Sequence, residues 1–131
     1  MIVYVDTSAA LKLAIEETES DALARYLSET QRQGDILIAS MLLYTELHCA
    51  AARRPAPPPA ASINSILRTI NLDDIDRSDL MLAAAMPGAL RSADTIHLAT
   101  ALRLGVDQFV AYDAELLNAA EKAGLNIAGP S

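Results

Sequence analysis

The chain has 131 residues and a formal net charge of −7 at pH 7, with a sequence pI of about 4.6. A composition that is 52% hydrophobic and 21% charged excludes an intrinsically disordered chain. The sequence has no long apolar run, so we expect no membrane span. It has no basic start followed by an apolar stretch, so we expect no secretory signal. The acidity argues against nucleic-acid binding through a basic surface, unless carboxylates hold divalent cations that face the phosphates.

Short apolar runs alternate with stretches of helical spacing along the whole chain. The apolar runs predict strands over residues 2–5, 36–39, 69–72, 108–111 and 126–128. The helical spacing predicts helices over residues 8–17, 20–33, 41–53, 62–68, 76–86, 93–104 and 114–123, with Ser40 and Ser92 as N-caps and Gly105 as a stop. Strands separated by helices need crossover connections, which give a parallel sheet covered on both faces. We therefore predict an α/β fold, a three-layer α/β/α arrangement with a mostly parallel central sheet, as a single domain over residues 1–131.

A proline-rich segment, RPAPPPAA, occupies residues 54–61. Proline lacks an N–H donor and clashes with the preceding helical turn, so the middle of this segment cannot be helical. Eight residues are too few to separate two domains, and we interpret the segment as a stiff connector within the domain.

The chain has one cysteine, Cys49, which cannot form an internal disulfide. It lies in an apolar stretch that we expect to form a largely buried helix, and this predicts a buried, unreactive thiol. The absence of disulfides is typical of a reducing compartment, so we expect a cytoplasmic protein.

Four acidic residues stand where a parallel sheet would collect them. Asp6 directly follows the first predicted strand, and Asp113 follows the fourth. Asp94 lies in the first turn of a helix, where the free N–H groups favour a charged carboxylate. Glu46 lies in an apolar helix, where a charge needs a partner. In folds of this class ligands bind at the carboxyl ends of the strands, so we expect the acids to converge there.

Each acid also has an ordinary structural interpretation. Asp6 and Asp113 could be turn or N-cap residues, Asp94 a favourable first-turn charge, and Glu46 the partner of Arg53 or Arg91. Together, however, clustered carboxylates repel one another and call for a cation. Ligation by oxygen alone, without cysteine or histidine at zinc spacing, indicates Mg²⁺ or Mn²⁺. The chemistry suited to such a site is phosphodiester hydrolysis, with one or two metal ions.

Four segments resemble the VapC-type toxins of the PIN-domain family. They are VYVDTSAALKLAIEE, ASMLLYTEL, RSADTIHLATALRLG and FVAYDAELLNAAEKAGLNI, and they cover essentially the whole chain with the acids in the family's order. The resemblance implies a PIN-like fold and a Mg²⁺-dependent endoribonuclease that is the toxin of a toxin–antitoxin pair. It also implies RNA as the substrate, a cognate antitoxin as a partner and a homodimer as the assembly.

Carried over residue by residue, the resemblance assigns catalysis and metal binding to four acids, with one supporting hydroxyl. The acids are Asp6, Glu46, Asp94 and Asp113, and the hydroxyl is that of Ser8. Tyr112 is a departure, because Thr or Ser more often precedes the last acid in this family. The proline-rich connector is a second departure, at the rim where RNA or antitoxin would lie.

The roles of the other polar residues follow from their spacing. His97 lies one helical turn after Asp94, and we expect it to have a structural hydrogen-bonding role, while His48 has none. Lys12, Arg53 and Arg91 are candidates for phosphate contact; each could equally be an ordinary surface charge.

Other functions account less well for the sequence. A haloacid-dehalogenase-type phosphatase needs Asp-x-Asp after its first strand, but Ser8 replaces the second acid here. A phosphoacceptor receiver domain needs an acidic pair after the first strand and a late lysine, neither of which is evident. Two alternatives stay open: a catalytically silent PIN-like module that binds nucleic acid or protein, and a metal-dependent DNA nuclease.

Overall fold

The computed structural model describes residues 1–131 and contains the predicted alternation of strands and helices. In chain order the elements are β1 (Ile2–Val5), α1 (Thr7–Ala14), α2 (Ser20–Arg32), β2 (Ile36–Ser40), α3 (Leu42–Ala52), α4 (Ala60–Leu67), β3 (Asn71–Asp73), α5 (Arg77–Ala85), α6 (Ser92–Leu104), β4 (Gln108–Val110), α7 (Ala114–Lys122) and β5 (Ile127–Ala128). Every predicted strand and helix is present, so the α/β prediction is confirmed.

The five strands form one sheet in the order β3-β2-β1-β4-β5. All neighbouring strands are parallel. The sheet was predicted to be mostly parallel, and it is parallel throughout. β1 lies at the centre, where Val3, Tyr4 and Val5 are fully buried. A strand covered on both faces has to be apolar at every position, which explains its uninterrupted apolar sequence.

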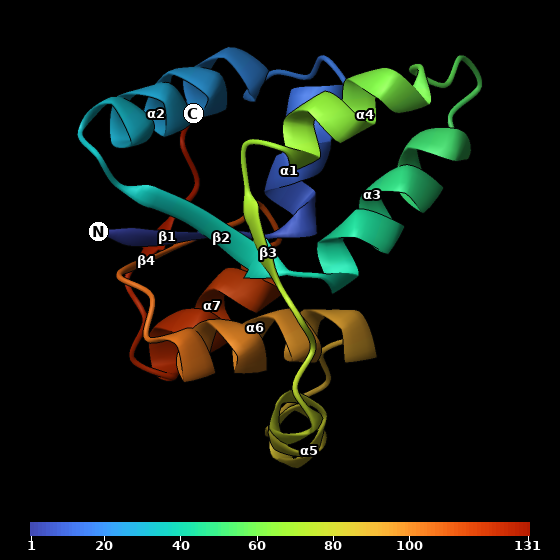
Figure 1. Cartoon of the computed structure of the whole chain (residues 1–131). Coiled ribbons are helices and arrows are strands. Elements are labelled where there is room, and N and C mark those ends of the chain that lie inside the picture. The colour runs from blue at the N-terminus through green and yellow to red at the C-terminus, as the bar shows by residue number, and fades with distance from the viewer.

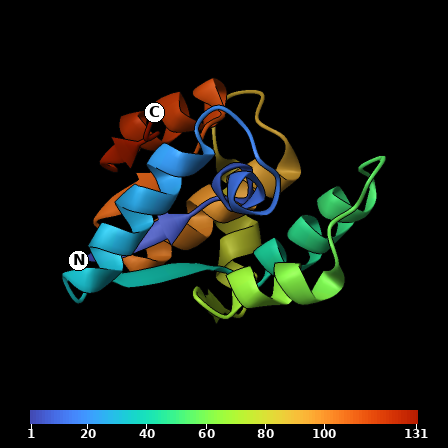
Figure 2. The same ribbon diagram turned by 90° about the horizontal axis from the view of Figure 1, so that it is seen from above.

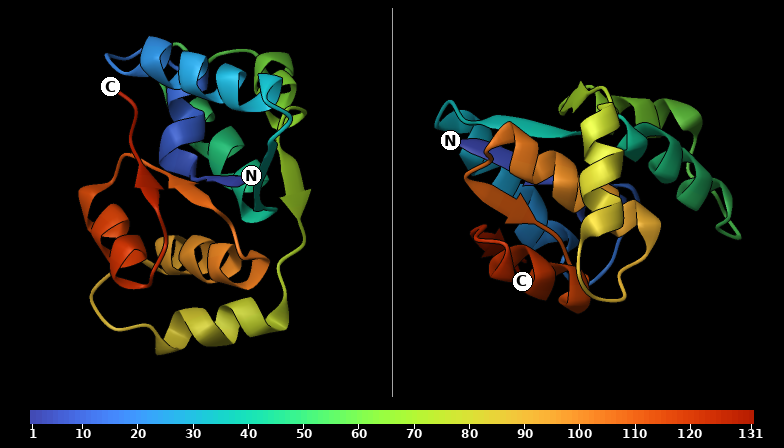
Figure 3. Two further views of the ribbon diagram at one scale, coloured as in Figure 1. Left: turned by 90° about the vertical axis from the view of Figure 1, so that its left-hand side faces the viewer. Right: turned by 90° about the horizontal axis from the view of Figure 1, so that it is seen from below.

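Helices cover both faces of the sheet and make the three layers (Figures 1 and 3). α1, α2 and α4 lie on one face, and α6 and α7 lie on the other. α5 packs on α6 and forms the outermost element on that side. The connector between α3 and α4 projects from the body of the molecule, as Figure 2 shows, and residues 54–59 in it are not helical. None of the helices is long and apolar enough to cross a bilayer.

The register of the strands brings several chain segments to one edge of the sheet. Val5 pairs with Val110, and Ser40 pairs with Asp73. Beyond the last pair of β1 and β4, the Asp6 N–H still donates to the Val110 carbonyl, at 3.0 Å. The residues that follow β1 and β4 are therefore neighbours at the carboxyl edge, as the sequence predicts.

Some element bounds differ from the predicted ones for local reasons. The first helix ends at Ala14 and not at residue 17, because the Ser20 hydroxyl hydrogen-bonds the carbonyls of Lys12 and Ile15 that a longer helix would use. The helix predicted from residue 62 begins at Ala60, directly after Pro59. Ser40 belongs to β2, yet its hydroxyl accepts a hydrogen bond from the Leu42 N–H and so acts on the start of α3.

The expectation of a largely buried α3 is wrong. Only Leu43, Leu47 and Ala51 are buried, along one stripe at helical spacing. Cys49 lies off this stripe and is exposed, so the predicted buried thiol is also wrong. An apolar composition made α3 look like a core helix, whereas only one narrow face packs on α1 and α4.

Candidate functional site

Asp6 lies at the centre of the carboxyl edge and is 2% exposed. It caps α1, and its Oδ2 accepts hydrogen bonds from the Ser8 N–H at 3.0 Å and from the Ser8 hydroxyl at 2.6 Å. Its Oδ1 is buried and has no hydrogen-bond partner. Leaving a buried carboxylate oxygen without a partner is costly, so this atom requires an explanation.

The Ser8 hydroxyl joins the two central strands at this edge. It donates to Asp6 and accepts from the Tyr112 N–H at 3.0 Å, just beyond the end of β4. Ser8 therefore fixes the orientation of the Asp6 carboxylate relative to the segment that leads to Asp113.

Asp113 and Asp94 stand at the N-termini of two helices. Asp113 caps α7, and its Oδ1 accepts from the Leu116 N–H at 3.1 Å. Asp94 lies in the first turn of α6. Partial burial raises the pKa of Asp94 to about 6, and the negative charges of Asp6, Asp113 and Glu46 act in the same direction. Asp94 is therefore near enough to the other three predicted acids to be affected by their charges.

Glu46 is held by hydrogen bonds and not by the arginines considered as partners. Its Oε1 accepts from the Thr7 hydroxyl at 2.7 Å and from Nε2 of His97 at 2.6 Å. Burial alone would raise the pKa of Glu46, but these two partners outweigh burial and lower it. Glu46 consequently stays ionised at the carboxyl edge.

His97 is buried behind Glu46. Its Nδ1 lies 2.7 Å from the Tyr4 hydroxyl, and its Nε2 also lies 3.1 Å from the Thr7 hydroxyl. Burial disfavours the charged imidazolium, but the hydrogen bond to Glu46 and the surrounding carboxylates outweigh burial and raise the pKa of His97. The predicted structural role of His97 agrees with these contacts.

The donor set at this edge fits a divalent cation that retains water ligands. As the side chains lie, no group of three or more acids, histidines or cysteines is arranged to hold an ion directly. Mg²⁺, however, usually keeps several of its waters and takes only one or two carboxylates directly. The unpartnered Oδ1 of Asp6 and the raised pKa of Asp94 are both features that a nearby cation would relieve.

The three basic residues predicted to contact phosphate lie in different surroundings. Lys12 is occupied, since its Nζ lies 2.9 Å from Glu19 and 3.5 Å from Glu17, and 4.9 Å from the centre of the Tyr112 ring. Arg53, at the end of α3, and Arg91, just before α6, are exposed and make no ion pair. Only these two are free to meet a phosphate.

Sequence reasoning missed two residues of this site, Thr7 and Tyr4. Thr7 lies between Asp6 and Ser8, and only these two neighbours were predicted to belong to the site. Tyr4 lies inside an apolar strand, and its hydroxyl was the only available signal, because a buried hydroxyl needs a partner.

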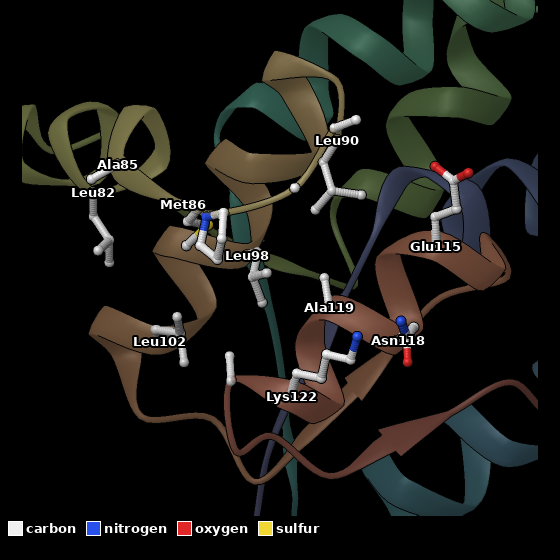
Figure 4. A pocket seen from close by; sticks show the side chains of 14 residues that line it. Leu82, Ala85, Met86, Leu90, Leu98, Leu102, Glu115, Asn118, Ala119 and Lys122 are labelled. Carbon is white, nitrogen blue, oxygen red and sulfur yellow. The ribbon is translucent and has the colours of Figure 1, made fainter.

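A separate apolar groove of about 710 Å³ runs between α5, α6 and α7 (Figure 4). Leu82, Leu90, Leu98 and Leu102 line it from one side, and Ala119 and Lys122 of α7 line it from the other. None of the four acids of the carboxyl edge lines this groove, so it is a distinct surface feature.

Comparisons with known proteins identify the family of this chain. The PIN domain family matches residues 3–122. Ribonuclease VapC46 of Mycobacterium tuberculosis is 38% identical over 133 residues and covers 98% of both chains. Ribonuclease VapC35 of the same species is 39% identical over 134 residues and covers 98% of this chain and 97% of the relative.

Solved structures share the fold at low sequence identity. VapC20 of Mycobacterium tuberculosis, a toxin that cleaves the sarcin–ricin loop, has a TM-score of 0.76 at 15% identity and covers 98% of this chain and 99% of its own. VapBC2 of Rickettsia felis, bound to a DNA fragment from its promoter, has a TM-score of 0.74 at 10% identity over 100% of both chains.

Proposed function

Because this chain belongs to the VapC group of the PIN-domain family, we propose that it is a Mg²⁺-dependent endoribonuclease, the toxin of a toxin–antitoxin pair. The observation that carries the proposal is the buried, unpartnered Oδ1 of Asp6 at an edge where other carboxylates repel one another. A site of this kind is costly without a cation, and it suits a cation that meets a phosphodiester.

In this proposal four carboxylates hold Mg²⁺ or Mn²⁺, some directly and some through its water ligands: Asp6, Glu46, Asp94 and Asp113. The bound cation would supply an activated water and charge neutralisation for the phosphate and the leaving oxygen. Ser8 keeps Asp6 in its orientation, and Thr7 with His97 keeps Glu46 ionised. Of the three basic residues predicted to contact phosphate, Arg53 and Arg91 are free of ion pairs and could contact the RNA backbone.

RNA is favoured over DNA as the substrate because the relatives at 38% and 39% identity are named ribonucleases. The same metal site would serve a DNA backbone, so a DNA nuclease is the alternative for the chemistry. A silent binding module is less well supported, because all four acids are present and near one another.

An antitoxin and a second copy of the chain are the proposed protein partners. The structural neighbours that contain VapB–VapC and FitA–FitB pairs support an antitoxin partner. The exposed apolar side chains of α5, Leu80, Met81 and Leu82, support a homodimer, since they would be covered in such an interface. A cytoplasmic location stays a prediction from the sequence.

The decisive experiment is an RNA cleavage assay on the wild type and on Asp6→Asn and Asp94→Asn. We expect cuts in total RNA with Mg²⁺ or Mn²⁺, none with EDTA, and a loss of at least about 100-fold in either variant, because each removes a metal ligand. Circular dichroism would establish that the variants are folded.

Glu121→Gln, an exposed change on α7, is the matched control and should cut like the wild type. Cleavage retained by both Asn variants would contradict the metal site. Cleavage of single-stranded DNA but not RNA would favour the DNA nuclease, and a folded, metal-binding wild type that cuts neither would favour the binding module.

A further inference from the structure

β1 contributes a polar side chain next to the site, in addition to Asp6, which directly follows the strand. The Tyr4 hydroxyl is fully buried, accepts a hydrogen bond from the Ser40 N–H at 3.0 Å and lies 2.7 Å from Nδ1 of His97. Its ring stacks on Phe109 at a centroid distance of 5.3 Å and meets His97 edge-on at 5.8 Å. The ring would fill this space without its hydroxyl, so packing alone does not account for a tyrosine here.

The imidazole of His97 links this hydroxyl to Glu46. A carboxylate only accepts hydrogen bonds, so Nε2 carries a proton that it donates to Oε1 of Glu46. The Thr7 hydroxyl donates to the same oxygen. Both bonds use Oε1, and neither uses Oε2. One oxygen of Glu46 is thus fixed from two sides while the other remains free for a ligand.

Glu46 and Thr7 hold the His97 ring at Nε2, and the Tyr4 hydroxyl is the hydrogen-bond partner of its other nitrogen, Nδ1. Because Nδ1 is bound to a fixed partner, Nε2 is the nitrogen that faces the carboxylate of Glu46. Hydrogen bonds of this outer kind orient the groups that bind a metal. Tyr4 itself is anchored by the backbone of β2 and by its stacked ring. The chain of contacts therefore runs from the centre of the sheet to the site.

We propose that Tyr4 is a positioning residue of this nuclease, which acts through the His97 ring to hold Oε1 of Glu46 so that the free oxygen meets the metal ion. The inference rests on the proposed function, because it takes Glu46 as a metal ligand. It assigns Tyr4 no contact with RNA or metal.

The test is Tyr4→Phe, which removes one oxygen and keeps the stacked ring. We expect the affinity for Mg²⁺, measured by calorimetry without RNA, to fall about 10-fold, the usual effect of losing such an outer hydrogen bond. The cleavage rate should fall by a similar factor, while KM for RNA stays unchanged. His97→Gln, which keeps a donor at the position of Nε2, should retain more metal affinity than His97→Leu.

Two controls separate positioning from a general loss of stability. Tyr26→Phe makes the same substitution on α2, and Leu27→Ala lowers the melting temperature through a cavity remote from the site. Neither should change the Mg²⁺ affinity of the folded protein. Tyr4→Phe with wild-type Mg²⁺ affinity and cleavage would overturn the proposal, as would an affinity loss equal to that of Leu27→Ala.

A spectroscopic measurement decides the inference even if the proposed activity fails. The chain has two histidines, so the imidazole ¹⁵N spectrum contains two ring systems, and His48→Gln assigns them. We expect a slowly exchanging Nε2 proton of His97 in the wild type that is lost or broadened in Tyr4→Phe. An identical Nε2 signal in both proteins would overturn the positioning role, whereas a wild type that binds Mg²⁺ but cuts no nucleic acid would overturn only the proposed function.

Discussion

At the scale of single residues, the candidate site combines carboxyl groups whose surroundings favour opposite protonation states. Hydrogen bonds from Thr7 and His97 lower the pKa of Glu46 and keep it ionised, while burial and the neighbouring carboxylates raise the pKa of Asp94 and favour its neutral form. A protein that gained only stability from these positions would not assemble four acids at one edge. The resulting loss of stability is local to Asp94, and it should be measurable without any substrate.

We predict that Asp94→Asn stabilises the metal-free protein. Well below pH 3.8, the ordinary pKa of an aspartate, the Asp94 carboxyl is neutral in the folded and the unfolded chain, so its raised pKa has no effect on stability there. As the pH rises to and beyond the folded pKa of about 6, the unfolded chain ionises first and the folded state loses stability. In EDTA at pH 7.5 the variant should gain about 1–2 kcal/mol, allowing for solvent screening.

Thermal unfolding between pH 4.5 and 7.5 would test this sign. The gain should shrink steadily as the pH falls, and Glu121→Gln should show no comparable trend. Millimolar Mg²⁺ should raise the melting temperature of the wild type more than that of Asp94→Asn. A variant less stable than the wild type at pH 7.5 in EDTA would contradict the assigned repulsion.

At the scale of elements, the sequence predicted what depends on local pattern and missed what depends on distant contacts. The strand β1 and the end of α6 at Gly105 were predicted, because each follows from its own residues. The exposure of Cys49 was not, since it depends on which side of α3 meets α1 and α4. The predicted topology brings Asp6, Asp94 and Asp113 to one edge of the sheet, but the hydrogen bonds of Thr7 and Tyr4 cross between elements, and the local pattern does not predict their partners.

The attachment of α5 to α6 is a contact of this distant kind. Asp79 is 1% exposed and accepts two hydrogen bonds from the Arg103 guanidinium, at 2.6 and 3.0 Å. It also accepts from the Asp76 N–H and so completes the N-terminal cap of α5. Burial would raise the pKa of Asp79, but the Arg103 hydrogen bonds outweigh it and lower that pKa.

We predict that Asp79→Asn destabilises the protein by about 2–3 kcal/mol, because it removes the charge of a buried, doubly bonded partner. Asp73 also meets Arg103, at 2.8 Å, but its side chain is 39% exposed, so Asp73→Asn should cost less than about 1 kcal/mol. Urea unfolding of the two variants would measure both values. Equal costs would mean that the burial of Asp79 contributes nothing.

At the scale of the whole molecule, the apolar residues left outside the core are unevenly distributed. Leu80, Met81 and Leu82 are exposed together on α5, the outermost element on its side of the sheet. A patch of this kind on a small protein usually marks a contact surface. Leu82 also lines the groove between α5, α6 and α7, and these exposed residues support the proposed homodimer.

We predict that Met81→Lys shifts the protein from dimer to monomer. The side chain is 66% exposed, so the change costs little in the isolated chain but would place a charge in the interface. Light scattering coupled to gel filtration would give the mass at micromolar concentrations. Ile36→Lys, at a 49% exposed apolar residue on β2, is the matched control and should leave the mass unchanged. A monomeric wild type, or the same mass in both variants, would exclude this face as the interface.

The exposed Cys49 has a practical consequence for following the protein at work. It is the only thiol in the chain, and it lies one helical turn from Glu46 on α3, where side chains three residues apart are neighbours. A maleimide fluorophore would attach there once, without mutagenesis, next to the proposed metal site. Cys49 is thus a natural labelling site, and the fluorescence of a label there could be used to measure the rates at which metal, RNA or antitoxin binds.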